Sequence, residues 1–172
     1  MENDGLNEIY VHGKLTSKEF IQYNILHTKK FRFRYFWLVY FLLFLLILLD
    51  IPFYLTDSLL ITAVVALFIA LLVIWLVKRL IIRRAAKEYD SDTLIQQEIH
   101  ITIHQQGITQ EIKGRTRSFY EWGNIVKGYE SKYLFLLYVS KNKAILLPKR
   151  FFRTEADMEQ FKRMTNQKGI FS

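Results

Sequence analysis

Two long apolar runs, close together in the chain, constrain this sequence more than any other feature. Residues 35–49 (YFWLVYFLLFLLILL) contain no charged side chain, and neither do the twenty residues 58–77. As helices the two runs extend roughly 22 and 30 Å, and a bilayer has a hydrocarbon core of about 30 Å. Apolar residues beyond Asp50 lengthen the first run. We therefore expect a transmembrane hairpin with spans at about residues 35–55 and 58–77.

Two other interpretations of these runs are weaker. A cleaved signal peptide fails for the first run, because more than thirty residues precede it and no small-residue cleavage site follows. Two buried helices of a soluble protein are disfavoured, because runs that are apolar on all sides are rare in a chain of 172 residues. Asp50 is either a turn residue at the interface or a functional intramembrane carboxylate. Its place beside Pro52 favours the turn.

The charges that flank the runs predict their orientation. The link 50–58 carries two Asp and no Lys or Arg. Positive charge concentrates on the cytoplasmic side of membrane proteins, so we expect a multi-pass protein of the cell membrane with both termini in the cytoplasm. The flanking cations on which this rests are Lys29, Lys30, Arg32, Arg34, Lys78, Arg79, Arg83 and Arg84.

The N-terminal segment, residues 1–34, predicts a strand and a helix. Residues 6–11 (LNEIYV) are short and β-prone, and they are free to add an edge strand to a sheet elsewhere. Thr16 and Glu19 form a capping box, with Thr16 as the N-cap of a helix. Since neither Pro nor Gly occurs between Thr16 and Leu49, we expect this helix to run without a break into the first span.

A second region of different periodicity follows the hairpin. Residues 78–92 predict a helix that leaves the membrane and a polar link, and residues 93–172 form the C-terminal domain. Residues 98–104 (EIHITIH) alternate between isoleucine and polar side chains, which is typical of a half-buried strand. We expect further strands at 108–113, 115–122, 133–139 and 144–147, and a final helix capped by Thr154. Strands followed by one helix indicate a bent antiparallel sheet that the helix closes, in an α+β membrane protein.

The order of these pieces resembles the YcxB-like family of small bacterial membrane proteins. The resemblance covers nearly the whole chain, and its most specific part is Leu147-Pro148-Lys149-Arg150 with Phe152. It implies a cytoplasmic domain similar to pleckstrin-homology folds and brings no established activity. The other matching residues are 13–20 (GKLTSKEF), 119–122 (FYEW) with Ile125, and 144–152 (AILLPKRFF).

Catalytic and metal-binding signatures are missing from the sequence. The chain has no Cys, and we find no phosphate-binding Gly-rich loop, no Ser nucleophile motif and no paired catalytic carboxylates. His100 and His104 lie four residues apart on one face of the alternating strand, roughly 13 Å from each other, so they cannot share a metal ion. We expect neither enzymatic activity nor a cofactor.

Basic charge is the remaining functional signal. Residues 93–172 contain thirteen Lys and Arg against seven Asp and Glu, a net charge of +6. A basic domain tethered at the inner leaflet is attracted to anionic lipid. Nucleic acid is a poor partner, because the aromatic residues have the pattern of a core rather than of an exposed stacking surface. The candidate contact residues for a protein partner or anionic lipid are Lys113, Arg115, Arg117, Lys149, Arg150 and Arg153. Arg150 also has a structural interpretation, which we favour, in which it bonds to backbone carbonyls where Pro148 ends the strand.

The sequence thus favours a non-catalytic, membrane-anchored interaction or scaffold module with a protein partner. The alternative is a membrane immunity or stress-protection protein that acts against a toxin or bacteriocin, an interpretation based on architecture alone. A lipid enzyme or transporter is disfavoured, because the only charged groups available near the spans are Asp50, Asp57 and the basic flanks. A homo-oligomer is compatible with the small side chains of Ala63, Ala66 and Ala70.

Overall fold

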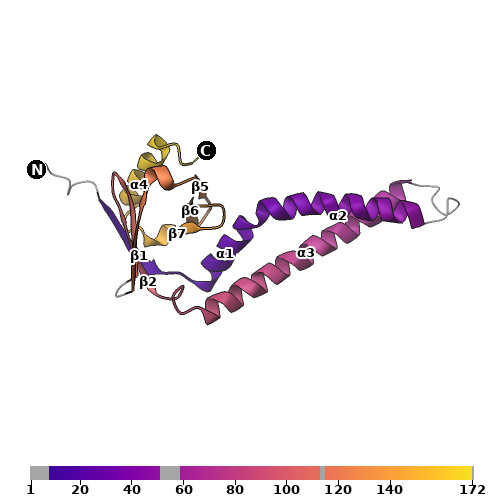
Figure 1. The fold of residues 1–172 in the computed structure, drawn as a ribbon, viewed down its shortest axis with the longest axis horizontal. Coiled ribbons are helices and arrows are strands. Elements are labelled where there is room, and N and C mark those ends of the chain that lie inside the picture. The colour runs from indigo at the N-terminus through magenta and orange to yellow at the C-terminus, as the bar shows by residue number, and fades with distance from the viewer. Residues whose placement is uncertain (1–7, 51–58, 113–114, 172) are drawn as a thin grey trace, which may run out of the picture. The chain divides into compact units, whose positions relative to one another are not determined.

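The computed structural model describes residues 8–50, 59–112 and 115–171 and shows an α+β protein with antiparallel sheets (Figure 1). Its helices are α1 (Ser17–His27), α2 (Lys29–Asp50), α3 (Leu59–Ser91) and α4 (Glu155–Gln167), with 3-10 turns η2 (Trp122–Asn124) and η3 (Lys149–Phe151). Its strands are β1 (Ile9–Lys14), β2 (Glu98–Ile103), β3 (Gly107–Ile112), β4 (Thr116–Glu121), β5 (Lys127–Glu130), β6 (Leu134–Tyr138) and β7 (Ala144–Pro148).

The chain divides into two compact units, and the boundary does not follow the order of the sequence. One unit contains residues 21–88, with most of α1 and all of α2. The other combines residues 1–20 with residues 89–172. The sheet domain is therefore built from chain on both sides of the apolar segment.

The first sheet has the strand order β1-β2-β3-β4, with every neighbouring pair antiparallel. The strand expected near residues 6–11 is present as β1, and it lies at the edge of the sheet beside β2, with Ile9 opposite Ile103 and Lys14 opposite Glu98. The alternation of β2 places Ile99, Ile101 and Ile103 in the core. Burying one face of each strand fixes the register, since a slip of one residue would expose every isoleucine.

The second sheet has the order β5-β6-β7. Its central strand is buried along residues 134–137, which are all at 0% exposure, as its continuous apolar sequence predicts. The single bent sheet expected from the sequence is therefore two separate sheets. The strand β5 was not expected, because its sequence KGYE lacks apolar alternation.

One hydrophobic core joins both sheets and α4. Phe161 of α4 is completely buried and packs edge-on against Phe135 of β6, with 5.0 Å between the ring centroids. The expected cap is present, since the Thr154 hydroxyl accepts a hydrogen bond of 3.1 Å from the backbone N–H of Asp157. Phe161 therefore closes the core from the helix side.

The helix expected to run from Thr16 to Leu49 is interrupted at Thr28, between α1 and α2. The Thr28 hydroxyl donates to the carbonyl oxygen of Asn24 at 2.7 Å, and Nη2 of Arg32 donates to that of Ile25 at 3.2 Å. Such side-chain bonds compete with the backbone ladder and bend helices. Hydrogen bonds from polar side chains therefore interrupt the helix, although the segment contains neither Pro nor Gly.

Among the described residues, one helix is long and apolar enough to cross a membrane, and it is the stretch Leu60–Ser91 of α3. Its most apolar window has a mean hydropathy of 3.1, and 17% of that window is buried. The helix α2 begins with four cations, and over its described residues it is not counted among the helices that are long and apolar enough to cross a membrane. The second span thus stays a prediction, and Asp57 and the link between the two helices lie outside the described residues.

The close contact of β1 with η3 gives a first test of the fold. A Cβ atom placed on Gly13 would lie 2.4 Å from Cε1 of Phe151, whose side chain is buried. We expect Gly13→Val to lower the free energy of unfolding by about 1–3 kcal/mol, because the ring must be displaced. The exposed neighbour Lys14→Val serves as the control and should change it by less than about 0.5 kcal/mol. Equal thermal stability of the two variants would contradict this packing.

Candidate functional site at the Arg150 junction

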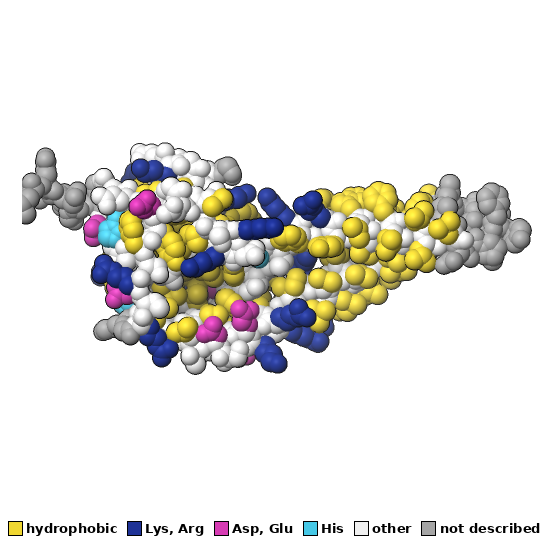
Figure 2. Space-filling model, viewed as in Figure 1, with side chains coloured by type: hydrophobic (Ala, Val, Ile, Leu, Met, Phe, Trp, Pro, Cys, Tyr) yellow, Lys and Arg dark blue, Asp and Glu magenta, His cyan; other side chains and the backbone are white. Residues whose placement is uncertain are grey.

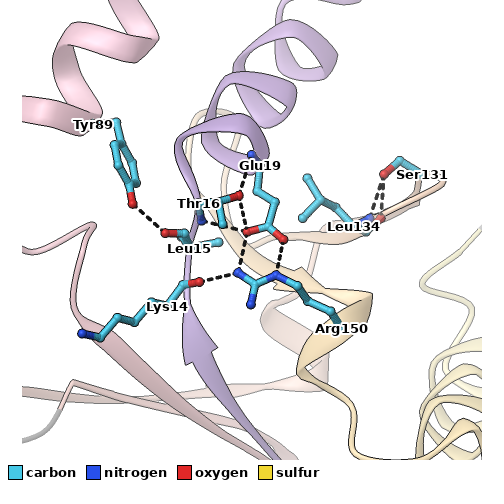
Figure 3. A network of polar contacts seen from close by, with 8 residues as sticks. All are labelled: Lys14, Leu15, Thr16, Glu19, Tyr89, Ser131, Leu134 and Arg150. Atoms are coloured by element: carbon cyan, nitrogen blue, oxygen red, sulfur yellow. Dashed lines mark hydrogen bonds and ion pairs between the residues drawn. The ribbon is translucent and has the colours of Figure 1, made fainter.

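A polar junction ties the start of α1 to η3 within the sheet domain (Figure 3). The guanidinium of Arg150 binds both carboxylate oxygens of Glu19, with 2.7 Å from Nε to Oε1 and 2.9 Å from Nη2 to Oε2. Nη2 also donates to the backbone carbonyl of Lys14. Two parallel hydrogen bonds between Arg and carboxylate combine charge with a fixed geometry.

The capping box expected at Thr16 positions the carboxylate of this junction. Oε2 of Glu19 accepts from the backbone N–H of Thr16 at 2.8 Å and from its hydroxyl at 2.9 Å, and the Thr16 hydroxyl accepts from the backbone N–H of Glu19 at 3.3 Å. One carboxylate therefore caps α1 and holds Arg150 at the same time. A second anchor comes from Tyr89, whose hydroxyl donates to the carbonyl of Leu15 at 2.7 Å.

The electrostatics of the junction follow from its burial. Burial raises the pKa of Glu19, but the hydrogen bonds from Arg150 and Thr16 outweigh this and hold the pKa below its usual value of 4.5. The bonds to Glu19 in turn raise the pKa of Arg150. The Glu19 side chain is 11% exposed and that of Arg150 is 49% exposed, so the carboxylate is the group that depends on its partner.

A second charge pair lies next to this junction. Lys149 binds Oε1 of Glu130 at the end of β5, and Nζ of Lys162 from α4 approaches the same oxygen at 3.3 Å. Burial raises the pKa of Glu130, and the two lysines lower it further than burial raises it, so it lies below the usual value. Both cations of the Lys149-Arg150 pair are thus engaged inside the domain.

The other expected contact residues are exposed. Arg115 and Arg117 lie at the start of β4, and Arg153 follows η3. Arg117 is opposite Glu111 in the register of β3 and β4. Arg115 and Arg117 therefore lie with the first sheet, whereas Arg153 follows β7 of the second sheet, as Lys149 and Arg150 do. Lys113 lies outside the described residues.

The flanking cations lie on the two long helices. Four are in the first turns of α2 and four are in the second half of α3, and Figure 2 shows Lys and Arg gathered at one end of a broad hydrophobic surface on these helices. The guanidinium of Arg79 stacks over the Trp75 ring at 4.4 Å, a pairing that suits a membrane interface. Nη1 of Arg32 is buried and has no hydrogen-bond partner among the described residues.

Sequence reasoning missed the pairing of Glu19 with Arg150. The capping box gives a local signal for Glu19, but its partner lies 131 residues away and no pattern in the sequence connects them. A hollow of about 490 Å³ lies elsewhere on the sheet domain; it is lined by Gln105, Gln160, Arg163, Met164, Gln167 and Lys168. None of these lining residues is an acid, so this hollow lacks an acid–base pair.

The family resemblance is confirmed by comparison with known proteins. Residues 103–165 match the model of a family described as YcxB-like protein. The match runs from the last residue of β2 into α4 and so covers β3 and β4 of the first sheet and the whole of the second sheet. A comparison with curated proteins finds no match.

A double-mutant cycle tests the junction. We expect Arg150→Ala to lower the free energy of unfolding by about 2 kcal/mol, because it leaves a nearly buried carboxylate without its main partner. Glu19→Gln should cost less, since the half-exposed guanidinium remains hydrated. The combined variant should cost less than the sum of the two. Strict additivity in thermal unfolding would show that the pair is not coupled.

The pH dependence of the same variants has a defined sign. A carboxyl whose pKa is lowered in the folded state stabilises the protein above its unfolded pKa, and this contribution is lost as the pH falls through the folded value. The stability difference between the wild type and Glu19→Gln should therefore be complete at neutral pH and shrink below about 4.5. A difference that is constant from neutral to acidic pH would contradict this assignment.

Proposed function

From the premise that this chain carries a YcxB-like segment over residues 103–165, we propose that it is a membrane-anchored, non-catalytic interaction module. It holds a basic sheet domain at the inner leaflet, where the domain docks a protein partner. The arrangement of four strands, three strands and a closing helix supports a pleckstrin-homology-like domain as part of this proposal.

The observation that carries the proposal is the insertion of the apolar segment between two paired strands. β1 precedes residues 21–88 and β2 follows them, yet the two strands pair along six residues of each. Paired strands lie in one compartment, so the segment between them crosses a membrane an even number of times. If α3 crosses, the chain must cross once more.

The helix α2 is the natural second crossing. It is 22 residues long, and it carries no charge from Tyr35 to Leu49. In α3 the small residues Thr62, Ala66 and Ala70 are buried at four-residue spacing, which marks one helix face covered within this unit. The apolar side chains on other faces of α3 are exposed, as lipid contact requires. These features support a hairpin, and the cations that flank the two apolar runs support a cytoplasmic location for both termini.

Single-cysteine labelling tests this topology, because the natural chain contains no Cys. We expect Lys18→Cys and Asn142→Cys to be shielded from a membrane-impermeant maleimide in intact cells, and Ser58→Cys to be labelled. All three should react after detergent treatment. Labelling of Lys18→Cys and Asn142→Cys from opposite sides would overturn the hairpin.

The attraction to the leaflet is tested in nanodiscs that contain the full chain. A solvent-sensitive fluorophore on Thr116→Cys, between Arg115 and Arg117, should report an apolar shift in anionic lipid that high salt reverses. The matched control is Asn166→Cys, an exposed position on α4. The shift should disappear in zwitterionic lipid. Identical spectra in both lipids would contradict the attraction of the basic surface to the leaflet, and the proposal would then rest on the membrane-spanning helices alone.

A further inference from the structure

The outer face of the first sheet carries a cluster of three aromatic rings that the proposed function does not use. His12 of β1 lies directly opposite His100 of β2, and the two imidazoles stack with 5.6 Å between centroids and 17° between planes. Tyr10 lies beside both, with centroids 5.7 Å from His12 and 5.9 Å from His100. We propose that His12 and His100 form a two-ligand surface site for a divalent transition-metal ion.

Hydrogen bonds already occupy one nitrogen of each ring. Nδ1 of His12 is 2.9 Å from Oε1 of Glu98, and Nδ1 of His100 is bonded to the hydroxyl oxygen of Tyr10. A carboxylate that accepts from Nδ1–H fixes the tautomer in which Nε2 of the neutral ring carries the free lone pair, and most metal-binding histidines are held by such a partner. His100 reaches the same state when its Nδ1–H donates to the phenol oxygen. Each ring then keeps Nε2 as the atom that binds the metal.

The surroundings allow a cation to approach. The His12 side chain is 46% exposed, and neither Nε2 has a hydrogen-bond partner among the described residues. Opposed side chains in antiparallel strands start about 5 Å apart, so rotation about the side-chain bonds of both residues can bring one nitrogen of each ring to the same ion. Glu98 and Glu111, which is opposite His100 on β3, add negative charge, and Lys14 and Arg117 at the periphery oppose it.

The donor set decides which ion is bound and how. The described residues contain no group of three or more His, Cys, Asp or Glu that could hold a metal ion, so water must complete the coordination. Two imidazoles favour Cu²⁺, Ni²⁺ and Zn²⁺ over the harder Mg²⁺ and Ca²⁺, with Cu²⁺ the tightest. The site is therefore open and exchangeable rather than structural.

The test uses Cu²⁺ as the probe and the full-length protein in detergent. Electron paramagnetic resonance at one equivalent should show coupling to two imidazole nitrogens, and to one in His12→Asn or His100→Asn. Either change should weaken Cu²⁺ binding in calorimetry by at least about tenfold, since the loss of an orienting partner alone costs that much. His104→Asn is the matched control, because it removes a histidine next to β2 and should leave affinity unchanged.

Two further measurements make the result decisive. Glu98→Gln should weaken binding less than His12→Asn while keeping both nitrogen couplings, which separates a positioning residue from a ligand. Circular dichroism of the copper-free variants checks that the exposed substitutions leave the fold intact. Wild-type affinity in both His12→Asn and His100→Asn would overturn the proposal. Loss of binding in His104→Asn alone would also overturn it, by placing the ion on another histidine.

Discussion

The pairing of β1 with β2 is the constraint on which the rest of the structure depends. The two strands exchange hydrogen bonds across more than eighty residues of intervening chain, and that intervening chain contains both apolar runs. Closing such a long loop is entropically costly, so the sheet must repay it through buried side chains. Ile9 and Val11 do so, since both lie in the core that α4 closes. The sheet domain is consequently built from segments that lie on both sides of the apolar runs in the sequence.

The Arg150 junction secures this arrangement where β1 gives way to α1. At that point the edge strand ends and the chain leaves the domain, so its backbone polar groups need new partners. Glu19 satisfies the N-terminus of the helix, and Arg150 bonds to the carbonyl of Lys14 and to Glu19 together. The junction thus ties the start of α1 to η3 at the point where β1 ends.

Local patterns predicted the local structure well. The alternation of residues 98–104, the apolar run at 133–139 and the caps at Thr16 and Thr154 each correspond to an element of the expected kind, because burial and capping are properties of neighbouring residues. The family resemblance was confirmed over residues 103–165. Two local expectations were wrong. The helix breaks at Thr28 because side chains form hydrogen bonds to its backbone. The strand β5 forms from a sequence without strand character because it pairs with β6.

Contacts between distant segments were beyond the reach of sequence patterns. Glu19 with Arg150, Tyr89 with Leu15 and His12 with His100 each join residues more than seventy positions apart. The separation of His100 from His104 along one strand was a sound reason to reject a shared ion there. The spacing along that strand could not reveal His12, because His12 lies on β1, which precedes the apolar segment in the sequence.

The most direct test of the central claim is a disulfide between β1 and β2 in native membranes. Tyr10 and Thr102 are directly opposite on the outer face of the sheet, and opposed Cα atoms lie about 4.5–5.5 Å apart, within reach of a disulfide. In a chain without other cysteines, the account predicts that Tyr10→Cys with Thr102→Cys cross-links on mild oxidation, and that Tyr10→Cys with Glu98→Cys does not. Failure of the opposed pair to cross-link, with both thiols reactive, would contradict a domain closed across the apolar segment.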